Sequence, residues 1–357
     1  MAVVGLTGFL CARSVTIWQI QIVHSDTPPR LYLANQNGAL VSVIDMTSNT
    51  VIETVDLQAL GFSATAKPHH VVVEPDGSAW YLSLIADNRV LKFDRANQLV
   101  GQVEFERPGL MALDPSSNRL YVGRSMAAVN PPQRIGVVDR TTMELDEVDV
   151  FFPRPHAIAV SPSGRFVYSA SLALNQLGAY DTETDAVELE TLDGATHTMV
   201  QFALAPDGNT LFATGQLTGT LLVFDVSRSP AIKLTGTVQL GHQPWHPVIT
   251  PDGRFLYVGN KDDNSVSVVD LETLAVVTTI TGSGLAEPHG SAVSADGKYV
   301  YISNRNLKGA YTPREQDGGE GQVGTVVVIN TASNTIESVI EVDRYPAGMG
   351  TMTRHAQ

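Results

Sequence analysis

Short apolar runs separated by turn residues recur along nearly the whole chain. The stretch QPWHPVITPDGRFLYVGNKDDNSVSVVDLETLAVVTTI, from Gln243 to Ile280, contains four such runs, HPVI, RFLYVGN, SVSVVD and AVVTTI. Val, Ile, Leu, Phe and Tyr dominate the runs, and Pro, Asp and Gly stand between them, which is the pattern of β-strands joined by tight turns. This stretch therefore predicts a unit of four short strands.

The unit repeats along the chain with a period of 40 to 47 residues. A turn of the PDG type marks it at six positions: Pro75, Pro115, Pro162, Pro206, Pro251 and Ala295. An apolar run closed by an acid or amide marks it at seven: Asp45, Asp94, Asp139, Asp181, Asp225, Asp270 and Asn330. Four-stranded units repeated seven times predict an all-β, seven-bladed β-propeller with antiparallel blades around a channel.

The two ends of the chain predict how the ring closes. The first unit has three clear strands, and the C-terminal stretch YPAGMGTM resembles an isolated first strand. We expect this C-terminal strand to complete the first blade and cover its open edge. The alternative is TIWQIQIV, Thr16 to Val23. Residues 25–357 then form one propeller domain, and residues 1–24 are an export segment or an extra strand.

Two stretches carry a resemblance to known families. GRFLYVGNKDDNSVSVVDLETLAVVTTI and GKYVYISNR, followed by GTVVVINTASNTIESVI, are similar to units of the YVTN-repeat seven-bladed propellers, and the similarity covers about residues 27–354. The SNR motif, Ser303 to Arg305, and the PH strand starts also resemble the related lactonase-like propellers. The resemblance implies the fold and an extracytoplasmic location, periplasmic or secreted, but it does not decide between binding and catalysis.

Charge and cysteine content narrow the partners. With 37 acidic and 23 basic side chains, the chain has a formal charge of −14 and no basic cluster, so a nucleic-acid partner is not expected. The single cysteine, Cys11, allows no intrachain disulfide. The apolar N-terminal segment is broken by Arg13 and lacks a basic n-region, so it predicts neither a regular signal peptide nor a stable membrane span.

The repeat also predicts a site, because the first strand of each blade lines the channel and equivalent positions form a ring. Six of the nine histidines stand at or just ahead of the predicted first strands, namely His69, His70, His156, His197, His246 and His289. The ends of the second strands reach the same face and carry the cations Arg124, Lys261 and Arg305. We expect these nine residues to surround the mouth of the channel.

Three interpretations of the histidines remain open. They could pack as repeat residues, or imidazoles from different blades could bind copper or zinc. They could also hold a small polar or anionic ligand with the help of the cations, with a histidine available as general base. No nucleophile or phosphate-loop motif is present and no motif implies a cofactor, so a lactonase would use an activated water. We favour binding of a small molecule or a protein partner, with lactone hydrolysis as the alternative.

Overall fold

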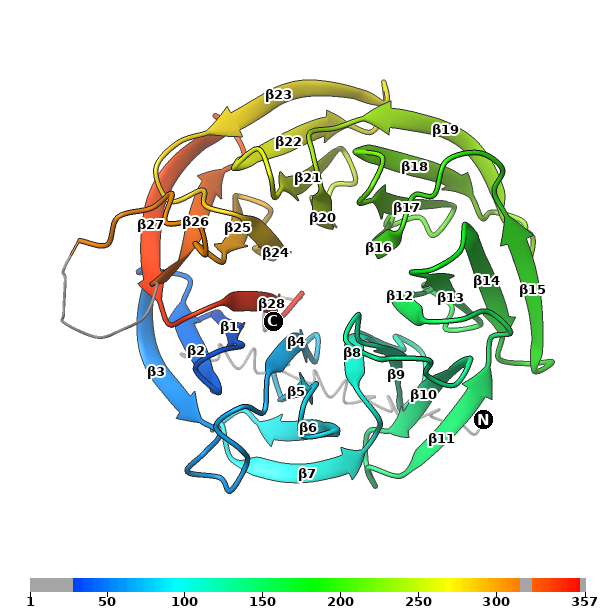
Figure 1. The fold of residues 1–357 in the computed structure, drawn as a ribbon, viewed down its shortest axis with the longest axis horizontal. Helices are drawn as coiled ribbons and strands as arrows, with labels where there is room; N and C mark the ends of the chain where they lie inside the picture. The colour runs from blue at the N-terminus through cyan, green and yellow to red at the C-terminus, as the bar shows by residue number, and fades with distance from the viewer. Residues whose placement is uncertain (1–27, 315–322, 354–357) are drawn as a thin grey trace, which may run out of the picture.

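Seven four-stranded antiparallel sheets are arranged in a ring about a central axis (Figure 1). The computed structural model describes residues 28–314 and 323–353. Within those ranges no helix has the length and apolar character needed to cross a membrane. The predicted seven-bladed all-β propeller is confirmed, whereas the predictions for residues 1–24 lie outside the described residues.

The four strands of every blade follow one another from the channel outwards. From the inner strand, the first four blades are β28 (Pro346–Thr351), β1 (Arg30–Asn35), β2 (Leu40–Asp45) and β3 (Thr50–Asp56); β4 (Pro68–Val73), β5 (Ala79–Leu84), β6 (Arg89–Asp94) and β7 (Leu99–Glu104); β8 (Pro108–Leu113), β9 (Arg119–Arg124), β10 (Arg134–Asp139) and β11 (Leu145–Asp149); β12 (Pro155–Val160), β13 (Phe166–Ser171), β14 (Gln176–Asp181) and β15 (Ala186–Thr191). The remaining three are β16 (Met199–Leu204), β17 (Thr210–Gly215), β18 (Thr220–Asp225) and β19 (Lys233–Gln239); β20 (Pro244–Ile249), β21 (Phe255–Asn260), β22 (Ser265–Asp270) and β23 (Ala275–Thr281); β24 (Pro288–Val293), β25 (Tyr299–Asn304), β26 (Gly324–Asn330) and β27 (Thr335–Val342).

The C-terminal strand closes the ring. Strand β28 pairs antiparallel with β1, with Leu31 opposite Thr351 and Leu33 opposite Met349. The blade therefore combines the two ends of the described chain, as the sequence predicted. The pairing covers the edge of β1, which would otherwise present unpaired backbone N–H and C=O groups. The alternative strand from Thr16 to Val23 lies outside the described residues.

The hydrophobic core is divided into seven clusters, each lying between two neighbouring blades. Between the first two blades, Trp80 stacks on Phe93 at 4.0 Å and on Tyr32 at 4.8 Å between ring centroids. Such stacking adds to the free energy of apolar burial. Because every blade is packed on both faces, the inner strands hold fixed positions around the channel.

A recurring backbone bond fixes the rim of the channel. The residue before each inner strand has φ between 49° and 58° although none is glycine: Lys67, Arg107, Arg154, Thr198, Gln243, Glu287 and Tyr345. The carbonyl of each accepts the N–H of the residue that follows the second strand of its blade, at 2.7 to 3.2 Å: Ile85, Ser125, Leu172, Gln216, Lys261, Arg305 and Gln36. This bond offsets part of the cost of a left-handed conformation.

Candidate functional site

The inner strands begin where the repeat alignment placed them. Their first residues are Pro68, Pro108, Pro155, Met199, Pro244, Pro288 and Pro346. The second position carries a large ring in four blades, at His69, His156, Trp245 and His289. In the other three blades it carries Gly109, Val200 and Ala347. A smaller residue lies between the rings all round the channel except at the sixth and seventh blades, where Trp245 and His289 are neighbours. The smaller residues leave the rings room to approach one another.

Five imidazoles from four blades meet in the channel, and we call His69, His70, His156, His246 and His289 the histidine cluster. All five residues are at most 7% exposed. Ring centroids lie 4.8 Å apart for His246 and His289, and 6.0 Å apart for His70 and His246. His69 lies 6.0 Å from His289 and 6.4 Å from His156. The structure therefore brings together five of the six predicted histidines.

Hydrogen bonds on one ring nitrogen show which nitrogen carries the proton in three of these residues. In His70, Nδ1 accepts the backbone N–H of Met111 at 3.2 Å, so Nε2 carries the proton. Nδ1 of His156 lies 2.6 Å from the carbonyl oxygen of Arg124, which can only accept, so Nδ1–H donates and Nε2 keeps a lone pair. Nδ1 of His69 accepts from the side-chain amide of Gln36 at 3.2 Å, so Nε2 carries the proton. Neighbouring rings thus offer one acceptor and one donor, which is the pair needed to handle a proton.

Several polar atoms of the cluster have no protein partner. They include Nε2 of His69, His156 and His246, and Nε1 of the adjacent Trp245, which are all buried. Buried polar atoms in folded proteins nearly always have a hydrogen-bond partner, because leaving one unpaired costs about 1–3 kcal/mol. Unpaired atoms gathered from separate blades indicate a place where a polar group binds.

Burial keeps the cluster neutral. It lowers the pKa of His70 to about 3 and that of His156 to about 4. Burial is also the largest cause for His69, His246 and His289, whose pKa lies well below its usual range. Neighbouring imidazoles lower these values further, and for His289 the carbonyl of Ala347 opposes the shift in part. At neutral pH the five rings therefore act as uncharged donors and acceptors.

The positive charge beside the cluster belongs to Arg305, which is 8% exposed. Its guanidinium carbon lies 4.4 Å from the ring centroid of Tyr345 and 4.9 Å from that of Trp245, two cation–π contacts. Burial lowers its pKa to about 10, so it stays charged at neutral pH. Among the described residues no carboxylate lies within ion-pair distance of it, and Glu287 acts on it only from farther away. A buried cation without a counter-ion favours an anionic or strongly polarised ligand.

Three of the nine predicted residues lie outside this arrangement. Arg124 is buried, but its guanidinium binds Glu147, lies 3.5 Å from Glu106 and stacks on Phe105, so its side chain stabilises a blade. His197 is only partly buried and bonds Thr218 through Nδ1 at 2.8 Å.

Lys261 lies at the rim, 3.4 Å from the side-chain oxygen of Gln243 and 3.9 Å from Asp262. The structure therefore brings six of the nine predicted residues together, namely His69, His70, His156, His246, His289 and Arg305, and their role in ligand binding stays a prediction.

Three residues at the site were missed. Trp245 and Tyr345 flank Arg305, and Gln36 sets the proton position of His69. The repeat contains a signal for all three. Trp245 occupies the same inner-strand position as His69, Tyr345 occupies the left-handed position of its blade, and Gln36 is the equivalent of Arg305 in the first blade. The metal interpretation gains no support: the described residues contain no group of three or more His, Cys, Asp or Glu side chains suited to hold a metal ion.

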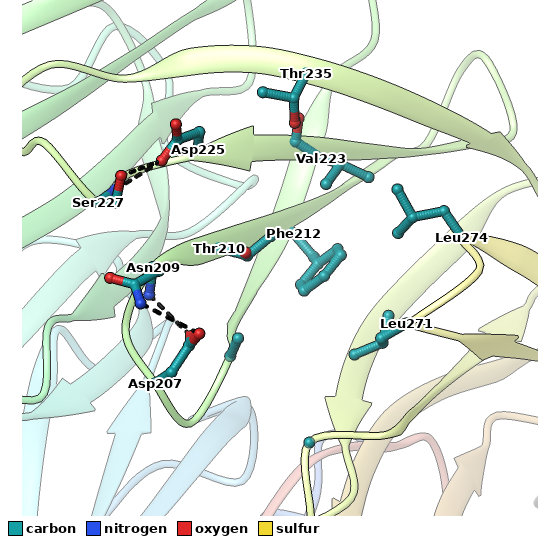
Figure 2. Close-up of a pocket in the computed structure, with 12 residues that line it drawn as sticks. Asp207, Asn209, Thr210, Phe212, Val223, Asp225, Ser227, Thr235, Leu271 and Leu274 are labelled. Carbon is teal, nitrogen blue, oxygen red and sulfur yellow. Dashed lines mark hydrogen bonds between the residues drawn. The ribbon is translucent and has the colours of Figure 1, made fainter.

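A separate cavity of about 520 Å³ lies between the fifth and sixth blades, over the turn that joins β16 to β17 (Figure 2). Its carboxylates, Asp207 and Asp225, accept hydrogen bonds from Asn209 and Ser227 of their own loops. Phe212 and Leu274 form its apolar side. Because the carboxylates already have local partners, this cavity is a weaker candidate than the histidine cluster.

Comparison with known proteins points to the lactonase propellers. A family model described as "Lactonase, 7-bladed beta-propeller" matches residues 195–283, which include β16 to β23. The chain is 21% identical to a 6-phosphogluconolactonase of Yersinia pestis, over 90% of this chain and 96% of that protein. It is 25% identical to the uncharacterized protein YwhL of Bacillus subtilis, over 52% of this chain and 43% of that one. The lactonase-like resemblance is supported, and the YVTN-repeat resemblance stays a prediction.

Solved structures agree on the fold. A functionally unknown protein from Desulfotomaculum acetoxidans superposes with a TM-score of 0.72 at 13% identity, over 91% of this chain and 99% of that one. A protein of Bacteroides fragilis described as a candidate 6-phosphogluconolactonase superposes with a TM-score of 0.68 at 13% identity, over 92% of this chain and 99% of that one. At these identities the likeness concerns the propeller architecture alone.

Proposed function

We propose that the histidine cluster binds and hydrolyses a small lactone. The observation that carries this proposal is a set of buried imidazole nitrogens beside the buried cation Arg305, none of which has a carboxylate partner in the part of the chain that the structure describes. The similarity to proteins named 6-phosphogluconolactonase supports the same reaction class. A lactone presents a polarised carbonyl, and its hydrolysis develops negative charge on that oxygen, which a buried guanidinium stabilises.

His156 and His69 define the proton path. Nε2 of His156 has a lone pair and removes a proton from water as the water oxygen attacks the carbonyl carbon. Nε2–H of His69, together with Arg305, stabilises the oxyanion. The ring C–O bond then breaks, and the leaving alkoxide takes the proton from His156 to give a hydroxy acid. No side chain changes its charge over the full cycle.

Ligand binding without turnover is the second candidate. Among the described residues, no ring nitrogen of the cluster has a carboxylate hydrogen-bond partner. A carboxylate usually orients a catalytic imidazole and stabilises its charged form. With backbone and amide partners only, His156 is a weak base, which fits a site that holds a ligand in place.

A pH-stat screen over sugar lactones and simple γ- and δ-lactones tests the proposal. His156→Gln is expected to lower kcat by about 10²- to 10⁴-fold, since it removes the base. Arg305→Ala is expected to lower kcat/KM by about 10²- to 10³-fold, since it removes the cation at the oxyanion. Arg140→Ala is the control, a largely buried arginine that pairs with Glu74 and has no contact with the cluster, and it should retain the rate. Equal rates in all four proteins contradict the proposal.

Calorimetry with gluconate, a hydroxy acid, distinguishes ligand binding without turnover from lactone hydrolysis. If gluconate binds in a manner that depends on Arg305 and no lactone is hydrolysed, the site binds a ligand without turnover. Elemental analysis of untagged protein tests the copper or zinc alternative, because a specific metal site gives near-stoichiometric content. The extracytoplasmic location and the possibility of a protein partner remain predictions.

A further inference from the structure

The channel continues beyond the histidine cluster as a cavity of about 430 Å³. Six of the seven inner strands contribute to its wall, and its apolar lining includes Val72, Leu113, Phe202, Val248, Val293 and Met349. His70 also lines it, so the cavity borders the cluster directly. Its volume falls within the range of small-molecule binding pockets.

The wall of this part of the channel carries no charge. The fourth to sixth residues of all seven inner strands contain no Asp, Glu, Lys, Arg or His. The two polar side chains among them already have partners: Ser291 donates to the carbonyl of His246 at 2.9 Å, and Thr351 donates to that of Arg30 at 2.8 Å. Three residues of a strand extend about 10 Å along the channel. The wall therefore offers an apolar compartment about 10 Å deep.

The two halves of the channel differ sharply in chemistry. One half carries unpaired imidazole nitrogens and a buried guanidinium, and the other carries Val, Leu, Ala, Met and Phe. The rings link them in sequence, because His70 borders the cavity and contacts His246, which contacts His289. An amphiphile with a polar head and an apolar chain fits this channel, since the head would contact the imidazoles and the guanidinium and the chain would contact the apolar wall.

We propose that the substrate or ligand is such an amphiphile: a lactone or carboxylate whose head group binds at the histidine cluster and whose alkyl chain enters the apolar compartment. The lactone form of this inference rests on the proposed function, whereas the binding form does not. A fully hydroxylated sugar would leave its hydroxyl groups unpaired against the apolar wall, so it is the poorer fit for this compartment.

Chain length provides the test. Each buried CH₂ is worth about 0.8 kcal/mol, or about fourfold in affinity. Dodecanoate should therefore bind at one site far more tightly than butanoate in calorimetry, and kcat/KM should rise from γ-butyrolactone to γ-octalactone. Val248→Asp is expected to flatten both dependences by placing a charge in the compartment. Val248→Thr keeps the side-chain shape and should weaken dodecanoate binding several-fold. This variant still tests the proposal if Val248→Asp fails to fold.

Val277→Asp is the matched control, because Val277 is 50% exposed on the outer strand β23 and should keep the wild-type dependence. The outcomes separate the two proposals. Hydrolysis without any dependence on chain length overturns the amphiphile and keeps the lactonase. Dodecanoate binding that Val248→Asp weakens, without hydrolysis, keeps the amphiphile and overturns the lactonase. Binding at many sites, or equal binding to the Val248 and Val277 variants, overturns the amphiphile.

Discussion

Acidification should destabilise this propeller through its histidines. A histidine with a folded-state pKa below its unfolded value of about 6.5 stabilises the fold fully above that value. The unfolded chain takes up protons as the pH falls below about 6.5, whereas the folded chain does not until its own pKa is reached. The contribution is therefore lost as the pH falls from about 6.5 toward the folded values, about 4 for His156 and about 3 for His70.

The magnitude follows from these values. One pH unit corresponds to about 1.4 kcal/mol for each such group, so a descent from pH 6.5 to 5 costs about 2 kcal/mol for each ring. His70 and His156 together then lose about 4 kcal/mol, if their titrations are independent. Their coupling makes this an upper value, because the charge on His156 is itself one cause of the lowered pKa of His70. A loss of this size is a large part of the stability of a typical domain.

Urea unfolding at pH 7.5 and pH 5 measures the effect. The double variant His70→Gln with His156→Gln removes both titrating groups and keeps polar side chains, so carboxylates elsewhere titrate equally in the two proteins. The wild type should lose about 3–4 kcal/mol more than the double variant between the two pH values. An equal loss in both would refute the argument that burial holds these rings neutral.

Three further predictions concern the parts of the blades that hold the site in place. Arg124→Ala should lower the free energy of unfolding by about 2 kcal/mol, as measured by urea unfolding, because it removes a buried guanidinium that binds Glu147 and stacks on Phe105. Gly348→Ala should cost about 1–3 kcal/mol and weaken ligand binding, because the new Cβ would lie 2.6 Å from the carbonyl oxygen of His69. Gly236→Ala is its control, because a Cβ there meets no atom within 4 Å, and an equal loss in both would contradict the reasoning. Removal of residues 346–357 should increase association in light scattering, since it exposes the edge of β1.

The fold could be predicted closely because the same pattern of residues occurs in all seven units. Each unit places a proline or methionine at the start of the inner strand and an Asp or Asn at the end of the third strand. A local hydrogen bond explains the Asp or Asn at the end of the third strand, since Oδ1 of Asp45 accepts the N–H of Thr47 at 2.7 Å. Ring closure followed from counting strands, because the first unit lacked one and the last stretch supplied it.

The site could be predicted only in part, because a strand position does not give the direction of a side chain. Arg124 and Arg305 stand at nearly equivalent places in their repeats, yet one turns to Glu147 in its blade and the other stacks on Trp245 at the channel. The choice depends on which neighbour presents a carboxylate and which presents an aromatic face. Glu147 comes from β11 of the same blade, whereas Trp245 comes from the preceding blade, and this information is not contained in the unit itself.

The position of the site at the axis also explains why its destabilising groups are tolerated. Imidazole nitrogens and a guanidinium that have no carboxylate partner among the described residues cost stability, but seven separate cores between the blades hold the inner strands in place. The same arrangement makes the site depend on the whole ring, because His70 and His246 meet only if the blades between them, on both sides, are in place. Strand β28 belongs to that requirement directly, since it lies between β24, which carries His289, and β4, which carries His69. Opening the ring should therefore abolish ligand binding even where the individual blades stay folded.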